Sequence, residues 1–147
     1  MTDSGGFTTS RNMGGTAERV YAAFVEPAKL EQWFVVDGYH TPADRMRVDA
    51  VPGGRMDAVM ISDADGSEIP FGFEYTELEP PQRLVMTFQQ PDEVVTITIL
   101  EQDNGSVDVT YFFERTPAPT DDAVEFARKG ADDMLGRIAA GVERGSI

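Results

Sequence analysis

The segment that most constrains the fold is residues 71–88, FGFEYTELEPPQRLVMTF, because it predicts two strands and the turn between them. Apolar and polar residues alternate on both sides of the turn, which is the period of two of a half-buried strand. Pro80 and Pro81 mark the turn, since proline lacks a backbone N–H and fixes φ. The apolar positions are Phe71, Phe73, Tyr75, Leu84, Met86 and Phe88. They predict a hairpin whose apolar face must be covered, and residues 120–145 are the only later segment long and amphipathic enough to cover it.

Two short helices are expected between the first and second strands. Residues 1–6 are polar and glycine-containing and should be flexible, and residues 7–13 should form a first edge strand. Thr16 is the expected N-cap of the first helix, and Pro27 suits the first turn of the second helix, AKLEQWF. The periodicity then disappears into a loop at residues 35–44.

More strands are expected as far as about residue 114, followed by a long closing helix. Alternation at residues 56–60 and 107–113 and a β-branched run at residues 94–100 each predict a strand in a meander. Thr120 is the expected N-cap of the last helix, whose apolar stripe runs from residue 124 to residue 142. The pattern predicts an α+β fold with an antiparallel sheet of six to seven strands around a C-terminal helix.

Composition restricts the partners of the chain. Its 147 residues are enough for one domain, which we expect to span residues 1–147. Twenty-six acidic and 12 basic residues give a formal charge of −14, which repels nucleic acid and anionic lipid surfaces. The sequence has no apolar run of the ~20 residues that a membrane span needs and no signal region, so we expect a cytoplasmic protein without membrane insertion. The absence of cysteine excludes disulfides and thiolate sites, and no cofactor is expected.

Three motifs resemble one known family. EPAKLEQWF is similar to the family's proline-led second helix that ends in tryptophan, VPGGRM to its Gly-Gly-Arg turn, and GFEYTELEPPQRLVMTF to its hairpin. From about Thr9 to Val142 the chain resembles the SRPBCC (START/Bet v1-like) superfamily, in the branch named after the activator of Hsp90 ATPase homologue. The resemblance implies a helix-grip fold, in which a curved sheet and the C-terminal helix enclose an apolar cavity that often takes a small hydrophobic molecule.

The resemblance departs from the family pattern in the middle of the last helix. Family members commonly show Gly-Trp there, whereas this chain has Gly130 and Ala131. The volume of an indole ring is therefore either missing or filled by other side chains. The family's name also implies a chaperone partner and a role in the stress response, although single-domain members lack the additional segments that an Hsp90 cochaperone would use.

The apolar residues of the expected inward face could line a ligand site or form an ordinary packed core, and the pattern leaves both interpretations open. Methionine and aromatic side chains make adaptable apolar walls. Tyr75 and Tyr111 add inward hydroxyls, which need a partner that a ligand or water could supply. The expected ligand-binding residues are Trp33, Phe34, Met56, Met60, Phe71, Phe73, Tyr75, Met86, Phe88, Tyr111, Phe113, Ala127, Ala131 and Met134.

Three functions follow from these patterns. The first is binding of a small apolar molecule, for sensing, sequestration or transport, by a monomer or weak homodimer. The second is a cyclase- or aromatase-like enzyme in which Tyr75, Tyr111 and Arg55 polarise a substrate in the same cavity. The third is a chaperone-associated interaction module. The sequence leans against an enzyme, because no acid–base pair is identifiable by spacing.

Other polar residues have a functional and a structural interpretation. His40 could be a general base, but a lone loop histidine more often has no catalytic role. Arg45, Arg47 and Arg55 could hold an anionic head group, or could form surface ion pairs, which is the favoured interpretation.

The carboxylates near residue 65 are the remaining candidates for a metal site. Asp63, Asp65 and Glu68 match a hairpin turn better than a calcium loop, which needs further ligands and a later glycine. No metal is therefore expected.

Overall fold

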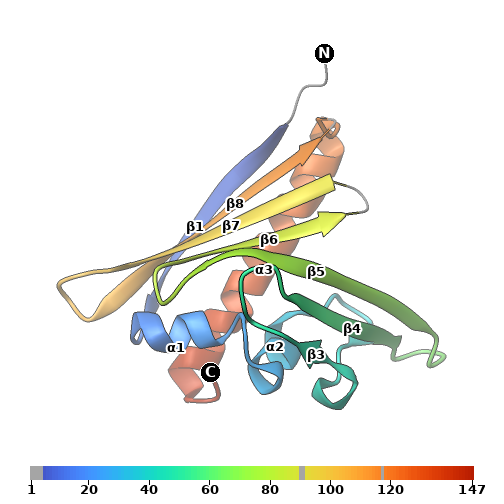
Figure 1. Ribbon diagram of the computed structural model, residues 1–147, viewed down its shortest axis with the longest axis horizontal. Helices are drawn as coiled ribbons and strands as arrows, with labels where there is room; N and C mark the ends of the chain where they lie inside the picture. The colour runs from blue at the N-terminus through green and yellow to red at the C-terminus, as the bar shows by residue number, and fades with distance from the viewer. Residues whose placement is uncertain (1–4, 90–91, 117) are drawn as a thin grey trace.

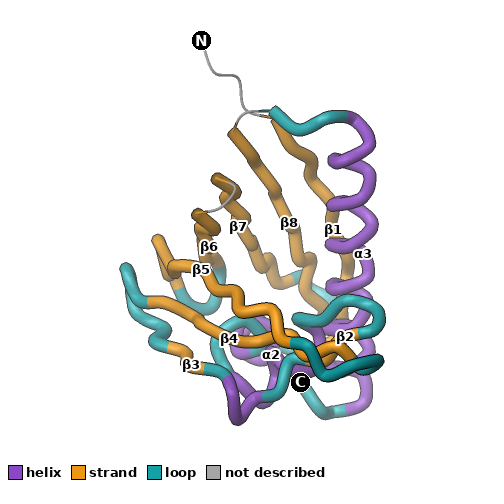
Figure 2. The backbone as a smooth tube through the Cα atoms, turned by 90° about the vertical axis from the view of Figure 1, so that its right-hand side faces the viewer, coloured by secondary structure: helices purple, strands orange, loops and turns teal. Residues whose placement is uncertain are grey.

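The structure is a computed structural model that describes residues 5–89, 92–116 and 118–147. Its main feature is a curved antiparallel sheet with a long C-terminal helix along one side (Figures 1 and 2). The elements are β1 (Gly5–Gly14), α1 (Ala17–Ala22), α2 (Pro27–Trp33), β2 (Tyr39–His40), η1 (Ala43–Arg45), β3 (Arg47–Val48), β4 (Arg55–Ser62), β5 (Glu68–Glu79), β6 (Arg83–Gln89), β7 (Asp92–Glu101), β8 (Ser106–Thr116) and α3 (Asp121–Arg144). The strand order is β1-β8-β7-β6-β5-β4-β2, and β3 also pairs with β4.

This architecture confirms the predicted helix-grip fold, with differences at the ends of strands. Within the described ranges, six strands have seven residues or more and two strands have only two. β1 begins at Gly5, so Gly5 and Gly6 belong to the sheet, two residues before the expected start of the first strand; residues 1–4 lie outside the described residues. The loop expected at residues 35–44 contains the short strand β2 and the start of η1. The start of β1 and the strand β2 occur where a neighbouring strand, β8 or β4, offers backbone partners that sequence periodicity does not reveal.

The helices begin at the predicted caps. The Thr16 hydroxyl accepts a 3.2 Å hydrogen bond from the backbone N–H of Arg19, and Thr120 does the same for Ala123. Pro27 is at the first turn of α2, where its missing N–H has no helical partner to lose. None of the helices in the described part of the chain is long and apolar enough to cross a membrane.

Two buried hydrogen bonds attach the short helices to the rest of the core. The Trp33 indole N–H donates to the carbonyl oxygen of Ala23 at 2.6 Å, which joins α2 to the end of α1. The Tyr75 hydroxyl donates to the carbonyl oxygen of Phe24 at 2.7 Å, which joins β5 to the α1–α2 connection. α1 and α2 therefore close one end of the concave side of the sheet (Figure 1).

α3 lies along β1, at the edge of the sheet, while β4 and β5 curve away from it (Figure 2). Arg128 donates to the Thr8 carbonyl at 3.2 Å, and its guanidinium lies 5.0 Å from the centre of the Phe7 ring. The Thr9 hydroxyl donates to the Asp132 carboxylate. Polar contacts at the edge thus hold the middle of α3 beside β1, and the apolar stripe of α3 faces the interior.

Candidate functional site

Alternate residues of the long strands face α3 and form one apolar core. Eight of the expected ligand-binding residues are buried within it: Trp33, Phe34, Met56, Phe73, Tyr75, Met86, Phe113 and Ala131. The other six are half-buried: Met60, Phe71, Phe88, Tyr111, Ala127 and Met134. The structure therefore brings all of these residues to the same interior, with a difference in solvent access between the two groups.

The half-buried residues are the incompletely covered members of the interior, and we refer to them together as the open end; one of them, Phe71, also lines a depression on the outer face of the sheet. The open end is defined by Met60, Phe71, Phe88, Tyr111, Ala127 and Met134. Phe88 and Phe71 stand near the aromatic cluster of the closed part, since the Phe73 and Phe88 ring centres are 5.2 Å apart and those of Phe34 and Phe71 are 5.1 Å apart. These apolar side chains point to the inward face of the sheet, yet water still reaches part of their surface.

The tyrosine hydroxyls have different surroundings. Tyr75 already donates to the Phe24 carbonyl, so its hydroxyl does not require the ligand or water considered from the sequence. Burial raises the pKa of Tyr111, and the negative charge of Glu93 raises it further. Tyr21 was not considered from the sequence, yet its buried hydroxyl has no hydrogen-bond partner within the described residues, and burial raises its pKa.

Two ionisable residues that the sequence reasoning missed lie on the inward face. Glu93 and Arg115 are directly opposed partners on β7 and β8, and Glu93 is also opposite Phe88 on β6. Arg115 is two residues after the buried Phe113, and Glu93 is two residues before the buried Val95, so both side chains point to the inward face. Burial raises the pKa of the Glu93 carboxyl, while the positive charge of Arg115 opposes that rise.

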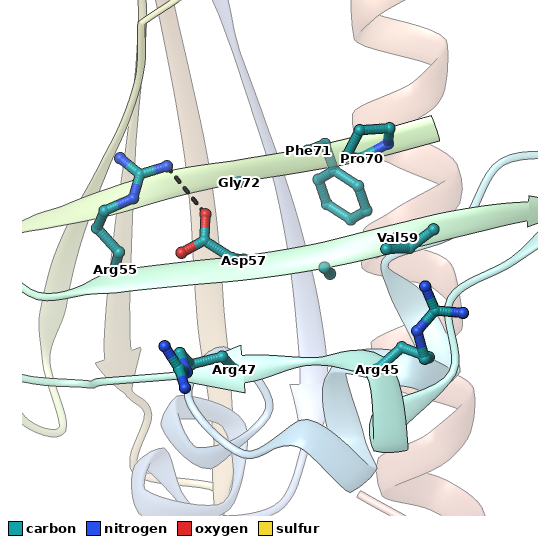
Figure 3. A pocket seen from close by; sticks show the side chains of 9 residues that line it. Arg45, Arg47, Arg55, Asp57, Val59, Pro70, Phe71 and Gly72 are labelled. Atoms are coloured by element: carbon teal, nitrogen blue, oxygen red, sulfur yellow. Dashed lines mark hydrogen bonds and ion pairs between the residues drawn. The ribbon is translucent and has the colours of Figure 1, made fainter. Parts of the chain in front are cut away.

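The arginine cluster expected near the sheet is on the opposite, outer face. It borders a shallow open depression of about 620 Å³ over β3, β4 and β5 (Figure 3). Arg55 pairs with Asp57 at 3.1 Å, and a Cβ atom at Gly72 would lie only 2.5 Å from the Asp57 carboxylate, so the glycine makes room for this pair. Arg45 pairs with Glu68 at 2.8 Å. Two of the three arginines are thus engaged in the surface ion pairs that the sequence favoured.

A second depression of about 620 Å³ lies beside the turn between β5 and β6. Its wall includes Ala17 and Glu18 of α1 and the turn residues Pro81 and Gln82. This depression is separate from the candidate ligand site, because none of the half-buried residues of the open end is among its lining residues.

His40 has an acidic partner that sequence spacing did not reveal. Its Nδ1 atom lies 2.7 Å from the Asp63 carboxylate, and the two side chains are 55% and 58% exposed. Glu68 pairs with Arg45, and Asp65 accepts a 2.9 Å hydrogen bond from the Ser67 N–H within its turn. The three carboxylates considered for a metal therefore have separate partners.

The polar groups proposed for an enzyme do not come together. Arg55 is on the outer face with Asp57, whereas Tyr75 is fully buried and bonded to Phe24. Of that set, Tyr111 is the one whose pKa is affected by the charge of Glu93. The predicted combination of Tyr75, Tyr111 and Arg55 as one polarising set is wrong, because the pleat of the sheet places Arg55 on the other face.

Solved structures share this fold over almost the whole chain. A crystal structure of a protein from Chromobacterium violaceum has 27% identity and a TM-score of 0.78, covering 94% of this chain and 96% of that one. The solution structure of an AHSA1-like protein from Aeromonas hydrophila has 21% identity and a TM-score of 0.75, with 95% and 94% covered. A protein of unknown function from Staphylococcus aureus has 15% identity and a TM-score of 0.82, with 99% and 97% covered.

The sequence itself matches one family model over most of its length. The model is described as "Activator of Hsp90 ATPase homolog 1-like protein" and matches residues 15–143. A comparison with curated proteins gave no match. The matched range contains both short helices, the closing helix except its last residue, and all the candidate interior residues.

Proposed function

The chain belongs to the family of activator of Hsp90 ATPase homolog 1-like proteins, and on this premise we propose that it binds a small, mostly apolar molecule between the sheet and α3. The molecule lies against the open end, next to the closed aromatic core. As the sequence leads us to expect, the binding protein is a single cytoplasmic domain that acts as a monomer or weak homodimer. Sensing, sequestration and transport all use such a site.

One observation supports this proposal above the others: apolar side chains that the fold turns inward are still partly exposed. Met60 and Phe71 come from β4 and β5, and Ala127 and Met134 come from α3, so two sides of the interior contribute. Covering this surface with an apolar molecule removes it from water, and each Å² covered contributes roughly 25 cal/mol. A packed core without a binding role would instead be expected to bury these positions as fully as it buries Phe73 and Met86, which are 0% and 2% exposed.

Native mass spectrometry of the freshly purified protein tests the proposal. We expect a fraction of the protein to carry an additional small mass, which disappears after unfolding and refolding. The refolded protein should then bind the neutral apolar probe N-phenyl-1-naphthylamine with a stoichiometry of one.

A variant separates binding at the open end from binding elsewhere. Ala127→Trp places a large ring among the half-buried residues of α3 and should weaken probe binding, whereas Asp133→Trp, at an exposed position of the same helix, should not. Probe binding that is absent from the refolded protein, or that is unaffected by Ala127→Trp, would contradict the proposed site.

A further inference from the structure

The inward face is not apolar throughout, because one end of it carries a pair of opposite charges. Phe88, Glu93 and Arg115 are opposed in one row across β6, β7 and β8. Phe88 belongs to the open end, so the charged pair is beside the apolar surface proposed for the ligand. Tyr111 faces the same interior four residues before Arg115 along β8.

The described residues leave both a hydrogen-bond donor and the charges of this pair without a partner. The Nε–H group of Arg115 is buried and has no hydrogen-bond partner among the described residues. The ion pairs within the same ranges include none between Arg115 and Glu93, although these residues are opposed on adjacent strands. A buried donor without an acceptor is costly, and most such groups in proteins have a protein, water or ligand partner.

The two charges together limit what a partner can be. An anionic ligand group would be attracted by Arg115 but repelled by the like charge of Glu93. A cationic group would be attracted by Glu93 but repelled by Arg115. A hydroxyl group can do both tasks, since its oxygen accepts from the Arg115 Nε–H and its hydrogen donates to the Glu93 carboxylate. An uncharged hydroxyl therefore matches a pair of fixed charges that sum to zero.

We propose that Arg115 and Glu93 bind the polar end of the ligand, and that the ligand is an uncharged amphipathic molecule that carries an alcohol or phenol group. Its apolar body lies against Phe88 and the rest of the open end, and its hydroxyl lies between the two charged side chains. This inference rests on the proposed function and specifies the chemical class of the ligand.

Three probes of similar size separate the contributions of shape, hydroxyl and charge: naphthalene, 2-naphthol and 2-naphthoate. Their dissociation constants are measured at pH 7 by titration of the ¹⁵N-labelled protein, followed by backbone amide shifts. We expect 2-naphthol to bind about tenfold more tightly than naphthalene, which is the size of one charge-assisted hydrogen bond. The anion 2-naphthoate should bind more weakly than 2-naphthol, because Glu93 repels it.

Three variants test which side chains cause these differences in affinity. Arg115→Met keeps a long apolar side chain and should bring 2-naphthol to within about twofold of naphthalene. Glu93→Gln keeps a hydrogen-bond acceptor and should raise the affinity for 2-naphthoate several-fold. Arg47→Met changes an exposed arginine on the outer face and should leave all three affinities unchanged.

The possible failures are distinguishable. Equal binding of naphthalene and 2-naphthol by the wild type, or a preference for 2-naphthol that survives Arg115→Met, would overturn the assignment of the polar end and leave the proposed function intact. Saturable binding of none of the three probes would overturn both. Circular dichroism of each variant confirms that a lost preference does not come from unfolding.

Discussion

The hydroxyl of Tyr75, in the middle of β5, donates a 2.7 Å hydrogen bond to the backbone carbonyl of Phe24, which is 51 residues earlier in the chain. Both residues are fully buried. Burial raises the pKa of Tyr75, with a smaller contribution from Tyr21, so the hydroxyl remains a donor at neutral pH. The bond fixes the α1–α2 connection against the sheet and so positions the closed part of the interior.

Tyr75→Phe should therefore lower the free energy of unfolding by about 1–3 kcal/mol, because it leaves the buried Phe24 carbonyl without this donor. Urea unfolding followed by circular dichroism measures the loss. Tyr111→Phe is the matched control, since the Tyr111 hydroxyl makes no hydrogen bond to the described residues and should cost much less. Equal losses for the two variants would show that the ring environment, and not the bond to Phe24, determines the effect.

Glu93→Gln should stabilise the protein at neutral pH and have little effect in acid. Burial raises the pKa of Glu93 in the folded state, because the desolvated site disfavours the charged carboxylate relative to the unfolded chain. Its contribution to stability is fully present below its ordinary pKa and is lost as the pH rises through the raised value. Glutamine resembles the neutral form, so the melting temperature should rise at pH 7 and change little near pH 3.5. A melting temperature that falls at pH 7 would mean that the attraction to Arg115 outweighs burial.

His40→Ala should leave ligand binding within about twofold of the wild type, despite the 2.7 Å contact with Asp63. The two side chains are more than half exposed, and an exposed ion pair contributes about 0–1 kcal/mol. If an enzymatic activity is found, this variant should retain kcat/KM within about tenfold, because a positioned general base contributes 10²–10⁴. A thousandfold loss would place the chemistry at His40 and Asp63.

The elements with a strong periodic pattern were predictable from the sequence. The hairpin of β5 and β6, the caps at Thr16 and Thr120 and the closing helix appear where alternation, hydroxyl caps and an apolar stripe predicted them. The fourteen expected interior residues also share one core. Each of these predictions depends on interactions within one element or between neighbours in the chain.

The inward position of the opposed residues Glu93 and Arg115 was not predictable in the same way, although the sequence contains a signal for it. The apolar runs suggested strands from residue 94 to 100 and from residue 107 to 113, whereas β7 begins at Asp92 and β8 ends at Thr116. Extending the alternation by one step in each strand places Glu93 and Arg115 inward. A charged residue at a strand end is normally taken as exposed, and only the pairing of β7 with β8 shows that these two are opposed.

The central claim is that an apolar molecule occupies the interior beside α3, and Ala131 is the position that tests it most directly. Ala131 is 2% exposed and lies one turn after the half-buried Ala127. Side chains on a helix lean toward its N-terminus, so a tryptophan at this position extends over Ala127 and into the open end. Asp133→Trp, at an exposed position of α3, is the control for adding an indole ring.

The measurement is binding of N-phenyl-1-naphthylamine to the wild type and to Ala131→Trp, with the melting temperature of each. If the interior accepts a ligand, the ring occupies that space: probe binding should weaken at least about tenfold, and the melting temperature should hold or rise. If the core is already solid, overpacking should cost ~1–3 kcal/mol, which lowers the melting temperature by roughly 2–12 °C, without removing any probe site. That second result would contradict the proposed function.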